Sequence, residues 1–443
     1  MLTLIKNGYI IDPASDREGI YDLLIEDDRI KLVEEHIPDE MLIELHEAKA
    51  FSKESDQKVI IIDASGKYVM PGFIDLHVHL REPGYEYKET IKSGSMAAAA
   101  GGFTTICPMP NTNPPIDSPE GIKLILDKAK EDSLVNILPV GCITLGQEGK
   151  VLADIGAMAE AGAVAISEDG KSVMDTSIYE KAMKEAANAG ILVFAHCEDK
   201  ALVNKGVINA GQKADELNLP GISNAVEDVI TARDIILAKE TGAKLHLCHV
   251  STSDSAAMIK LAKMEGLSVT GEVTPHHFTL SDEDIPRDDG NYKMNPPLRS
   301  LKDLEALKEA IKDNVIDAIA TDHAPHSREE KFTSFTKASF GIVGLETAFA
   351  LTMTELVKPG LISPRQMVEK LSANPARILN ISKGCIAKGW IADLVIADPE
   401  AVYNIDPRQF HSKAKHSPLD GRKVTGRITH TFVSGKLKYH DER

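Results

Sequence analysis

The stretch from Pro71 to Gly84 reads PGFIDLHVHLREPG and places two histidines, His77 and His79, one residue apart inside an apolar run. Side chains of a strand alternate between its two faces, so Asp75, His77 and His79 would project from the same side. Neutral imidazole is a common protein ligand for transition metals. Taken alone, the spacing leaves two interpretations open: a hydrogen-bonded histidine pair at a strand end, or the first ligands of a metal site.

Histidine and aspartate also follow other short apolar runs, and these runs belong to a regular pattern. From Met70 onward, runs rich in Val and Ile alternate with Ala-, Glu- and Lys-rich segments of helical period, which is typical of repeated βα units. Helices are expected at 151–162 and 179–190, each closed by a glycine that suits a helix C-terminus. We count eight candidate strands, at residues 72–80, 103–109, 135–141, 163–169, 191–197, 244–250, 268–275 and 315–325.

Eight such units predict an α/β fold, a (β/α)8 TIM-like barrel over residues 70–383. A doubly wound sheet is less favoured, because no GxGxxG opens the first helix and eight strands are enough to close a barrel. Functional residues of this barrel lie at the C-terminal ends of its strands. Five of the eight strands end in residues that could bind a metal: His77, His79, Asp169, His196, His249, Asp322 and His323.

The two ends of the chain follow a different pattern, with short alternating strands. We expect strands at 2–12, 21–35 and 59–69 before the barrel, and at 392–399 and 426–440 after it. Separate terminal domains are the alternative, but each piece is too small to bury a stable core. Residues 1–69 and 384–443 are therefore predicted to form one small composite β-sandwich domain beside the barrel. The polar segment 41–57 is expected to be a mobile loop.

Composition narrows the classes of function. The 443 residues include 50 Lys plus Arg and 67 Asp plus Glu, for a net charge of −17, and no basic run could follow a phosphate backbone. This argues against nucleic acid as a partner. No apolar run is long enough to span a membrane, and the first residues lack the pattern of a signal peptide. The 5 cysteines include no CxxC pair, which suits reduced thiols. A cytoplasmic enzyme is expected.

The number of potential ligands bears on the kind of metal site. His323 is expected to orient its neighbours rather than to bind a metal, which leaves four histidines and two aspartates. These six are too many for one tetrahedral zinc, but they suit two ions that share a bridging carboxylate. Imidazole and carboxylate ligands favour zinc, with manganese, cobalt or iron as substitutes that spacing does not exclude. The sequence therefore predicts a binuclear centre.

Several longer motifs closely resemble the dihydroorotases of the cyclic amidohydrolase superfamily, in the branch with an aspartate metal bridge. They are PGFIDLHVHLREPG, PMPNTNPP, AISEDG, FAHCED, HVST, KMNPPLR, ATDHAPH and SFGIVGLET, and they span essentially the whole chain. The resemblance implies a barrel of the metal-dependent hydrolase type that contains two Zn²⁺ ions. It also implies that one ion is held by His77, His79 and Asp322, and the other by His196 and His249.

The same resemblance implies that Asp169 bridges the two ions. Many relatives use a carboxylated lysine as the bridge, and Lys171 lies two residues further along the chain. In the branch that this chain resembles, the motif of the fourth strand ends in an acidic pair followed by glycine, which SEDG matches. We therefore prefer Asp169, with Lys171 as the alternative.

The resemblance further implies reversible cyclisation of N-carbamoyl-L-aspartate to L-dihydroorotate in pyrimidine biosynthesis. The nucleophile would be a hydroxide that bridges the ions, and Asp322 would act as general base and then as general acid. Arg81, two residues past His79, suits a bidentate contact to the substrate carboxylate. The family match adds Asn111 and His326 as partners of that carboxylate, and Asn295, Phe340 and Gly341 as contacts of the ring amides. The polar segment 326–341, which lacks an apolar period, is expected to close over the barrel mouth as a lid.

Two alternative functions remain at this point. Another cyclic amidohydrolase, such as an allantoinase or hydantoinase, would share the barrel and the HxH motif but lacks the combination of REPG with NTNP. A catalytically silent scaffold that binds aspartate carbamoyltransferase is the second alternative. Silent members usually lose metal ligands, whereas this sequence has all six. A homodimer is a further possible assembly.

Overall fold

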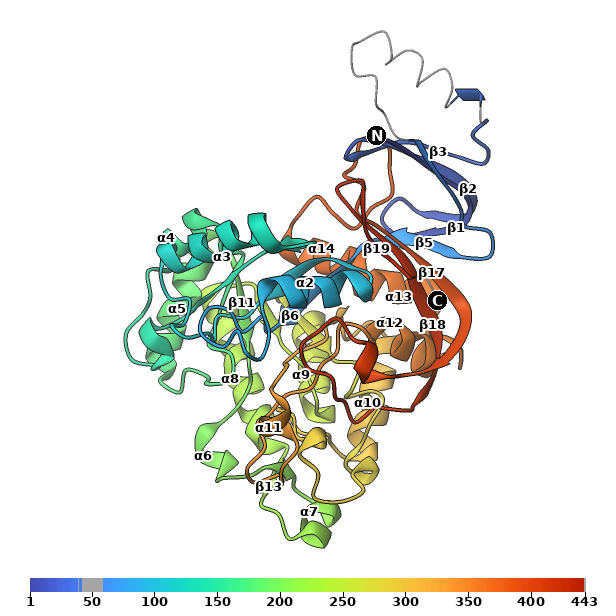
Figure 1. The fold of residues 1–443 in the computed structure, drawn as a ribbon. Helices are drawn as coiled ribbons and strands as arrows, with labels where there is room; N and C mark the ends of the chain where they lie inside the picture. Colours follow the sequence, from blue (N-terminus) through green and yellow to red (C-terminus); the bar gives the residue numbers. More distant parts are fainter. Residues whose placement is uncertain (39, 42–58, 442–443) are drawn as a thin grey trace.

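The structure, a computed structural model, describes residues 1–38, 40–41 and 59–441 of the chain. A ring of parallel strands surrounded by helices forms the larger part, and a β domain from both ends of the chain packs beside it (Figure 1). The predicted barrel with a composite terminal β domain is confirmed. Of the expected loop 41–57, all but Met41 lies outside the described residues.

The barrel strands follow one another around the ring in parallel. Their order is β6-β7-β8 and then β9-β10-β11-β14-β15-β16. Their bounds are Phe73–Val78 (β6), Phe103–Pro108 (β7), Asn136–Ile137 (β8), Val140–Cys142 (β9), Ala165–Ser167 (β10), Leu192–Ala195 (β11), Leu245–Leu247 (β14), Val269–Val273 (β15) and Ala318–Ile319 (β16).

The ring closes where the first strand meets the segment after the last one. Val78 pairs in parallel with His323, and the His79 amide donates to the His323 carbonyl at 2.8 Å. The strand expected at 135–141 is divided into β8 and β9, with Leu138 and Pro139 between them. Proline has no amide hydrogen to donate to a neighbouring strand, which accounts for the break.

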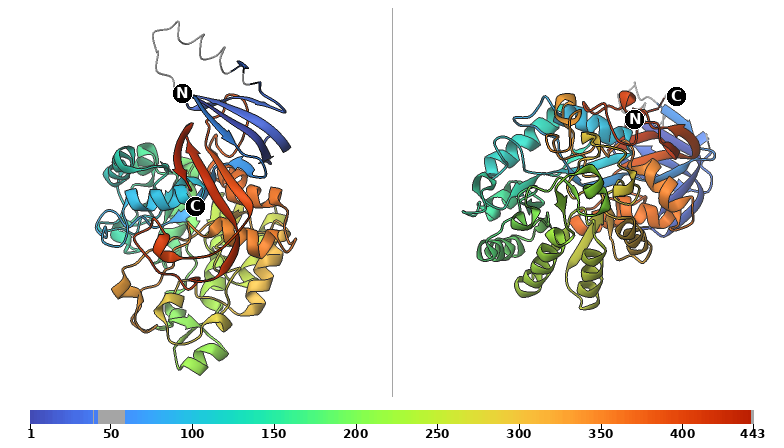
Figure 2. Two further views of the ribbon diagram at one scale, coloured as in Figure 1. Left: turned by 45° about the vertical axis from the view of Figure 1, so that its right-hand side comes forward. Right: turned by 90° about the horizontal axis from the view of Figure 1, so that it is seen from below.

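Helices connect the strands and cover the outside of the ring, as the right-hand view of Figure 2 shows. They are α2 (Ile91–Ala100), α3 (Pro119–Asp132), α4 (Ile155–Ala161), α5 (Thr176–Ala189), α6 (Lys200–Val203), α7 (Gln212–Leu217), α8 (Ala225–Thr241), α9 (Ser253–Met264), α10 (Leu301–Lys312), α11 (Arg328–Lys331), α12 (Ala348–Thr352), α13 (Pro364–Val368) and α14 (Asn374–Leu379). Two short strands, β12 (Ile208–Asn209) and β13 (Gly221–Ile222), form a separate pair.

Local sequence signals account for many helix boundaries. The Asp175 side chain accepts hydrogen bonds at the start of α5, and Gly190 ends that helix in the left-handed conformation. Asp154 and Gly162 play the same two roles for α4. A side-chain cap of this kind is worth about 1 kcal/mol, and glycine adopts the left-handed conformation without a steric penalty. Both glycine-terminated helices predicted from the sequence are therefore present.

The β domain is one hydrogen-bonded sheet with the strand order β19-β18-β17-β5-β1-β2-β3, and β4 pairs with β1. Its strands are β1 (Leu2–Asp12), β2 (Arg17–Glu26), β3 (Arg29–Glu34), β4 (Val59–Asp63), β5 (Tyr68–Pro71), β17 (Leu394–Asn404), β18 (Lys423–Val433) and β19 (Lys436–His440). The antiparallel pairing of β5 with β17 joins the two ends of the chain. Apolar residues from both ends share one buried cluster, in which Ile5 and Ile10 accompany Leu394 and Phe432. The exact division into 1–69, 70–383 and 384–443 stays a prediction.

Residues 405–422, which we call the β17–β18 segment, leave the sheet and run to the barrel mouth. The Ser412 hydroxyl donates to Glu89 Oε2 at 2.5 Å, and His416 Nε2 lies 3.1 Å from the His326 carbonyl oxygen. Both contacts reach loops that follow barrel strands. The β domain therefore touches the end of the barrel where the predicted site lies.

In the described part of the chain, no helix is both long and apolar enough to cross a membrane.

Candidate active site

The six predicted metal ligands meet at the C-terminal end of the barrel, and each is buried. Asp169 Oδ1 lies 3.3 Å from His77 Nε2, 3.5 Å from His196 Nδ1 and 3.9 Å from His249 Nε2. Its other oxygen lies 3.7 Å from His79 Nε2. The Asp169 carboxylate therefore faces four histidines, two from each of the predicted ion sites.

Asp322 closes the other side of the cluster. Its Oδ1 lies 3.0 Å from His79 Nε2 and 3.6 Å from His77 Nε2. The backbone at Asp322 has φ of 45° and that at His249 has φ of 37°, which are uncommon values for residues other than glycine. Backbone strain of this kind is concentrated at functional sites, where the surrounding structure maintains it.

The donor set fits a bound metal. His77 Nε2 is buried and has no hydrogen-bond partner in the described structure, although two carboxylates lie close to it. Among the described residues, His77 belongs to three compact groups of potential ligands. Two of them contain only predicted ligands: His77 with Asp169 and His249, and His77 with His79 and Asp322. The third joins His77 to Cys248 and Glu272. An unpartnered buried nitrogen is costly unless something binds it. A metal ion at this position would supply the missing partner.

The charges of the cluster support the same interpretation. Burial would raise the pKa of Asp169, but His77 and His249 hold that pKa well below its usual range. Burial opposes protonation of His77, yet the adjacent Asp169 carboxylate raises the pKa of that imidazole well above its usual value. The two ionised carboxylates, Asp169 and Asp322, thus create a negative environment around His77. This environment favours a bound cation.

Lys171, the alternative bridging residue, does not lie in this cluster. Its side chain is exposed, and its amide donates to the Glu168 carbonyl at 2.9 Å in a turn. Glu168 itself accepts hydrogen bonds from the amides of Ile143 and Thr144, so its carboxylate faces away from the histidines. Of the three residues, only Asp169 directs a carboxylate into the site.

Arg81, His326 and Phe340 lie together beside the cluster. Arg81 Nη2 is 3.2 Å from His326 Nε2, and His326 Nε2 is 2.8 Å from the Phe340 carbonyl oxygen. Lys88 Nζ lies 3.2 Å from the other ring nitrogen of His326. Burial and the neighbouring cations Arg81 and Lys88 lower the pKa of His326, which keeps the ring neutral. The structure thus brings two cations and a neutral imidazole together, and Glu330 Oε1 pairs with one of the cations, Lys88, at 2.9 Å.

The remaining predicted substrate residues have specific contacts. Asn111 lies between two of the predicted metal ligands: its amide donates to Asp169 Oδ2 at 2.8 Å, and its oxygen is 2.9 Å from His79 Nδ1. Asn295 donates to Glu198 Oε2 at 2.5 Å. A side chain at Gly341 would meet the Ala324 carbonyl oxygen at 2.4 Å, and its φ of +148° favours glycine. The packing therefore requires glycine at that position.

Sequence reasoning missed two carboxylates behind the histidines. Glu198 Oε2 is 2.8 Å from His196 Nε2, and Glu272 Oε1 is 3.2 Å from His77 Nδ1. Both residues could have been recognised in the sequence. Glu198 lies two residues after His196, and Glu272 is a charged residue inside an apolar strand. His323, expected to orient its neighbours, lies 3.4 Å from Glu89 Oε2.

Solved structures of similar fold identify the class of protein. The L-hydantoinase of Arthrobacter aurescens is 27% identical to this chain with a TM-score of 0.83, and the match covers 98% of this chain and 95% of that one. The D-hydantoinase of Thermus sp. is 28% identical with a TM-score of 0.82, over 100% and 96% of the two chains. The fold and the buried His/Asp site define a metal-dependent cyclic amidohydrolase.

Sequence relatives narrow this class. The family model described as Dihydro-orotase-like matches residues 66–255. The dihydroorotase of Caldanaerobacter subterraneus is 45% identical over 443 residues, which covers 100% of this chain and 98% of the relative. The dihydroorotase of Citrifermentans bemidjiense is 45% identical over 439 residues, with 99% and 100% covered. The chain belongs to the dihydroorotase family.

Proposed function

We propose that this enzyme interconverts N-carbamoyl-L-aspartate and L-dihydroorotate, a step of pyrimidine biosynthesis. The observation that carries the proposal is the cluster of six buried histidines and aspartates around the unpartnered His77 Nε2, in a chain that matches dihydroorotases along its whole length. Arg81 supports an anionic substrate, because it places a guanidinium beside the cluster in a protein of net charge −17.

We propose that the site holds two Zn²⁺ ions. His77, His79 and Asp322 would hold one ion, His196 and His249 would hold the other, and Asp169 would bridge them. When bound, zinc polarises a carbonyl group and lowers the pKa of water from about 15.7 to about 7. Asn111 and Glu198 hold the ligands in place through hydrogen bonds to His79, Asp169 and His196.

Asp322 is the proposed general base and general acid. In the direction of ring opening, its carboxylate accepts a proton from the attacking water and then returns it to the ring nitrogen as the amide bond breaks. The backbone conformation at Asp322, with φ of 45°, places the carboxylate at the cluster edge, where its Oδ1 lies 3.0 Å from His79 Nε2. A fixed position suits a group that must face the nucleophile and the leaving nitrogen in turn.

Arg81 and His326 are the proposed partners of the substrate carboxylate, together with Asn111. Arg81 Nε donates a hydrogen bond to the Pro325 carbonyl at 3.1 Å, which orients the rest of the guanidinium. Asn295, Phe340 and Gly341 are the proposed contacts of the ring amides. The Lys293 ammonium lies 4.3 Å from the centre of the Phe340 ring and fixes its position.

One preparation tests these proposals together: the metal content per chain is measured alongside turnover of dihydroorotate, hydantoin and allantoin. We expect two ions per chain and a preference for dihydroorotate of about 10³-fold or more, because a site built for a carboxylate rejects rings without one. Comparable turnover of hydantoin would contradict the proposed substrate. One ion per chain at full activity would contradict the binuclear centre.

Two protein partners are predicted: a second copy of the chain and aspartate carbamoyltransferase. Both stay predictions. Light scattering of the pure protein, alone and mixed with aspartate carbamoyltransferase, measures the mass of each assembly.

A further inference from the structure

Glu272 occupies a central position behind the predicted metal ligands. It lies in β15, a strand that supplies none of the six ligands, and its side chain is completely buried. Its Oε1 is 3.2 Å from His77 Nδ1 and 3.3 Å from the backbone nitrogen of His249, while Oε2 is 3.0 Å from His246 Nε2. One carboxylate therefore contacts a ligand of each predicted ion.

The contact with His77 decides which ring nitrogen can bind a metal. A carboxylate oxygen only accepts hydrogen bonds, so His77 Nδ1 must carry the hydrogen and donate it. In the neutral, metal-binding form of the ring the other nitrogen, Nε2, then presents its lone pair. This is the nitrogen that lies 3.3 Å from Asp169 Oδ1 and lacks a hydrogen-bond partner.

The contact with His249 constrains the backbone. The His249 amide donates to the same Oε1, and the residue has φ of 37°, a conformation that costs free energy for residues other than glycine. This hydrogen bond offsets part of that cost. The imidazole of His249 is thereby directed to the cluster, where its Nε2 lies 2.9 Å from His196 Nδ1.

The second oxygen of Glu272 is held from the opposite side. His246 Nε2 is its partner, and His246 Nδ1 is in turn 2.8 Å from the Thr270 hydroxyl. His246 is also completely buried. A continuous chain thus runs from Thr270 through His246 and Glu272 to His77, so the carboxylate has little freedom to rotate.

We infer that Glu272 is a positioning residue that selects the metal-binding tautomer of His77 and fixes the backbone at His249, and so couples the two predicted ion sites. The inference rests on the proposed binuclear function. Glu272 touches neither substrate nor the proposed ions and acts only through the two histidines. Partners of this kind usually change metal affinity or activity by about 10-fold to 100-fold.

The test compares Glu272→Leu with Glu272→Gln and follows release of zinc to a chromogenic chelator without substrate. Leucine removes the acceptor, so we expect zinc release to be about 10-fold to 100-fold faster than in the wild type. Glutamine keeps an oxygen for His77 Nδ1 while its amide can donate to His246, so we expect release within about threefold to tenfold of the wild type. Rescue by glutamine distinguishes positioning from loss of packing.

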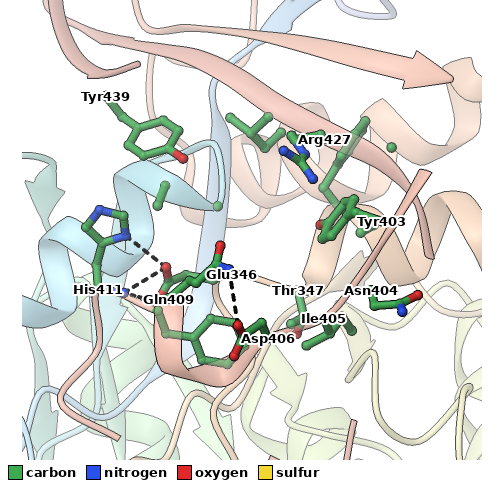
Figure 3. A pocket seen from close by; sticks show the side chains of 17 residues that line it. Glu346, Thr347, Tyr403, Asn404, Ile405, Asp406, Gln409, His411, Arg427 and Tyr439 are labelled. Atoms are coloured by element: carbon green, nitrogen blue, oxygen red, sulfur yellow. Dashed lines mark hydrogen bonds and ion pairs between the residues drawn. The ribbon is translucent and has the colours of Figure 1, made fainter. Parts of the chain in front are cut away.

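Glu346→Leu is the matched control. Glu346 also accepts hydrogen bonds from a histidine ring and from backbone amides, those of His411 and Ser412, but it lies in a pocket between the barrel and the β domain (Figure 3). This variant should release zinc at the wild-type rate. Wild-type zinc release from Glu272→Leu would overturn the inference, as would equal acceleration in the control.

A spectroscopic measurement covers the case in which Glu272→Leu does not fold. The visible absorption of cobalt-substituted Glu272→Gln should differ from that of the wild type, because the charge behind His77 is lost. An unchanged spectrum together with unchanged ion release would overturn the inference. Neither measurement uses dihydroorotate, so failure of the proposed reaction is detected separately, as absence of turnover by the wild type.

Discussion

The two ends of the barrel both bury charged groups, but they differ in how completely those groups are paired. At the N-terminal end, Lys370 donates to Asn314 Oδ1 at 3.0 Å and to the Ile316 carbonyl at 2.8 Å, and Lys263 lies 2.7 Å from Asp317. At the C-terminal end, His77 Nε2 faces two carboxylates without a hydrogen bond. A buried charge alone therefore does not indicate chemistry in this fold. An unpartnered buried nitrogen among several potential metal ligands, as at His77, is a more specific indication.

The largest expected effect follows from removing the shared carboxylate. Asp169→Ala should lose at least one ion per chain and lower kcat/KM by roughly 10³-fold or more, because a bound metal supplies several kcal/mol of transition-state stabilisation. Elemental analysis and turnover of dihydroorotate measure the two effects. Lys171→Ala is the control and should keep both ions. The reverse result would assign the bridge to Lys171.

Asp322→Asn should lower kcat by about 10²-fold to 10⁴-fold, since an amide cannot accept and return the proton. Its metal content must be measured first, because Asp322 is also a proposed ligand. At equal metal content, binding of dihydroorotate should change much less than turnover. Turnover close to that of the wild type would remove Asp322 from the proton-transfer role.

Replacing Arg81 tests whether the cations beside the cluster select the substrate. Arg81→Met should lower kcat/KM for dihydroorotate by about 10²-fold to 10³-fold, which corresponds to loss of one partner of a buried charged contact. Dihydrouracil, the same ring without the carboxylate, should be affected far less. Arg233→Met is the control, because that guanidinium pairs with Asp234 at 2.8 Å outside the site. An equal loss for both rings would mean that Arg81 does not bind the carboxylate.

The smallest effect on activity is expected at the opposite end of the barrel. Lys370→Met should leave kcat unchanged but lower the free energy of unfolding by about 1–3 kcal/mol, because the buried Ile316 carbonyl loses its donor. Chemical denaturation and steady-state kinetics measure these quantities. A large fall in kcat would contradict the comparison, because it would show that the N-terminal end of the barrel also affects catalysis.

The same lysine gives a pH dependence with a defined sign. Burial lowers the pKa of Lys370 to about 8 in the folded protein, whereas an unfolded lysine titrates near 10.4. Between these values the unfolded chain binds more protons, so the stability of the wild type relative to Lys370→Met should rise with pH. Denaturation curves at pH 7 and pH 10 measure the change. A constant difference would mean that Lys370 titrates normally.

The barrel and the convergence of the six candidate ligands were predictable because their signals are local. Each expected strand is a short apolar run, and each ligand lies at the end of such a run. The hydrogen bond from His77 to Glu272 was not predictable, because it joins residues 195 positions apart. Asn111 was expected to contact substrate, and its bonds to His79 and Asp169 depend likewise on how distant loops meet.

Segment 326–341 shows a second limit of pattern reasoning. It lacks an apolar period, yet Lys331 and Phe335 are both buried. Lys331 Nζ donates to the carbonyls of Lys293 and Gly341 at 2.8 Å and 2.7 Å, so a cationic side chain anchors the segment through backbone oxygens. Hydropathy does not report such an anchor. Closure of this segment over substrate stays a prediction.

The contacts of the β17–β18 segment have a consequence for the order of events during protein synthesis. The loops that follow β6 and β16 leave the ribosome before Ser412 and His416, which bond to Glu89 and His326. Domains emerging from the ribosome begin to fold from the N-terminal side. The barrel strands can therefore associate first, whereas the loops after β6 and β16 gain their last hydrogen bonds only when residues 405–422 have emerged. A nascent chain arrested before Ser412 would contain every predicted metal ligand and still lack the final support of the loops at the barrel mouth.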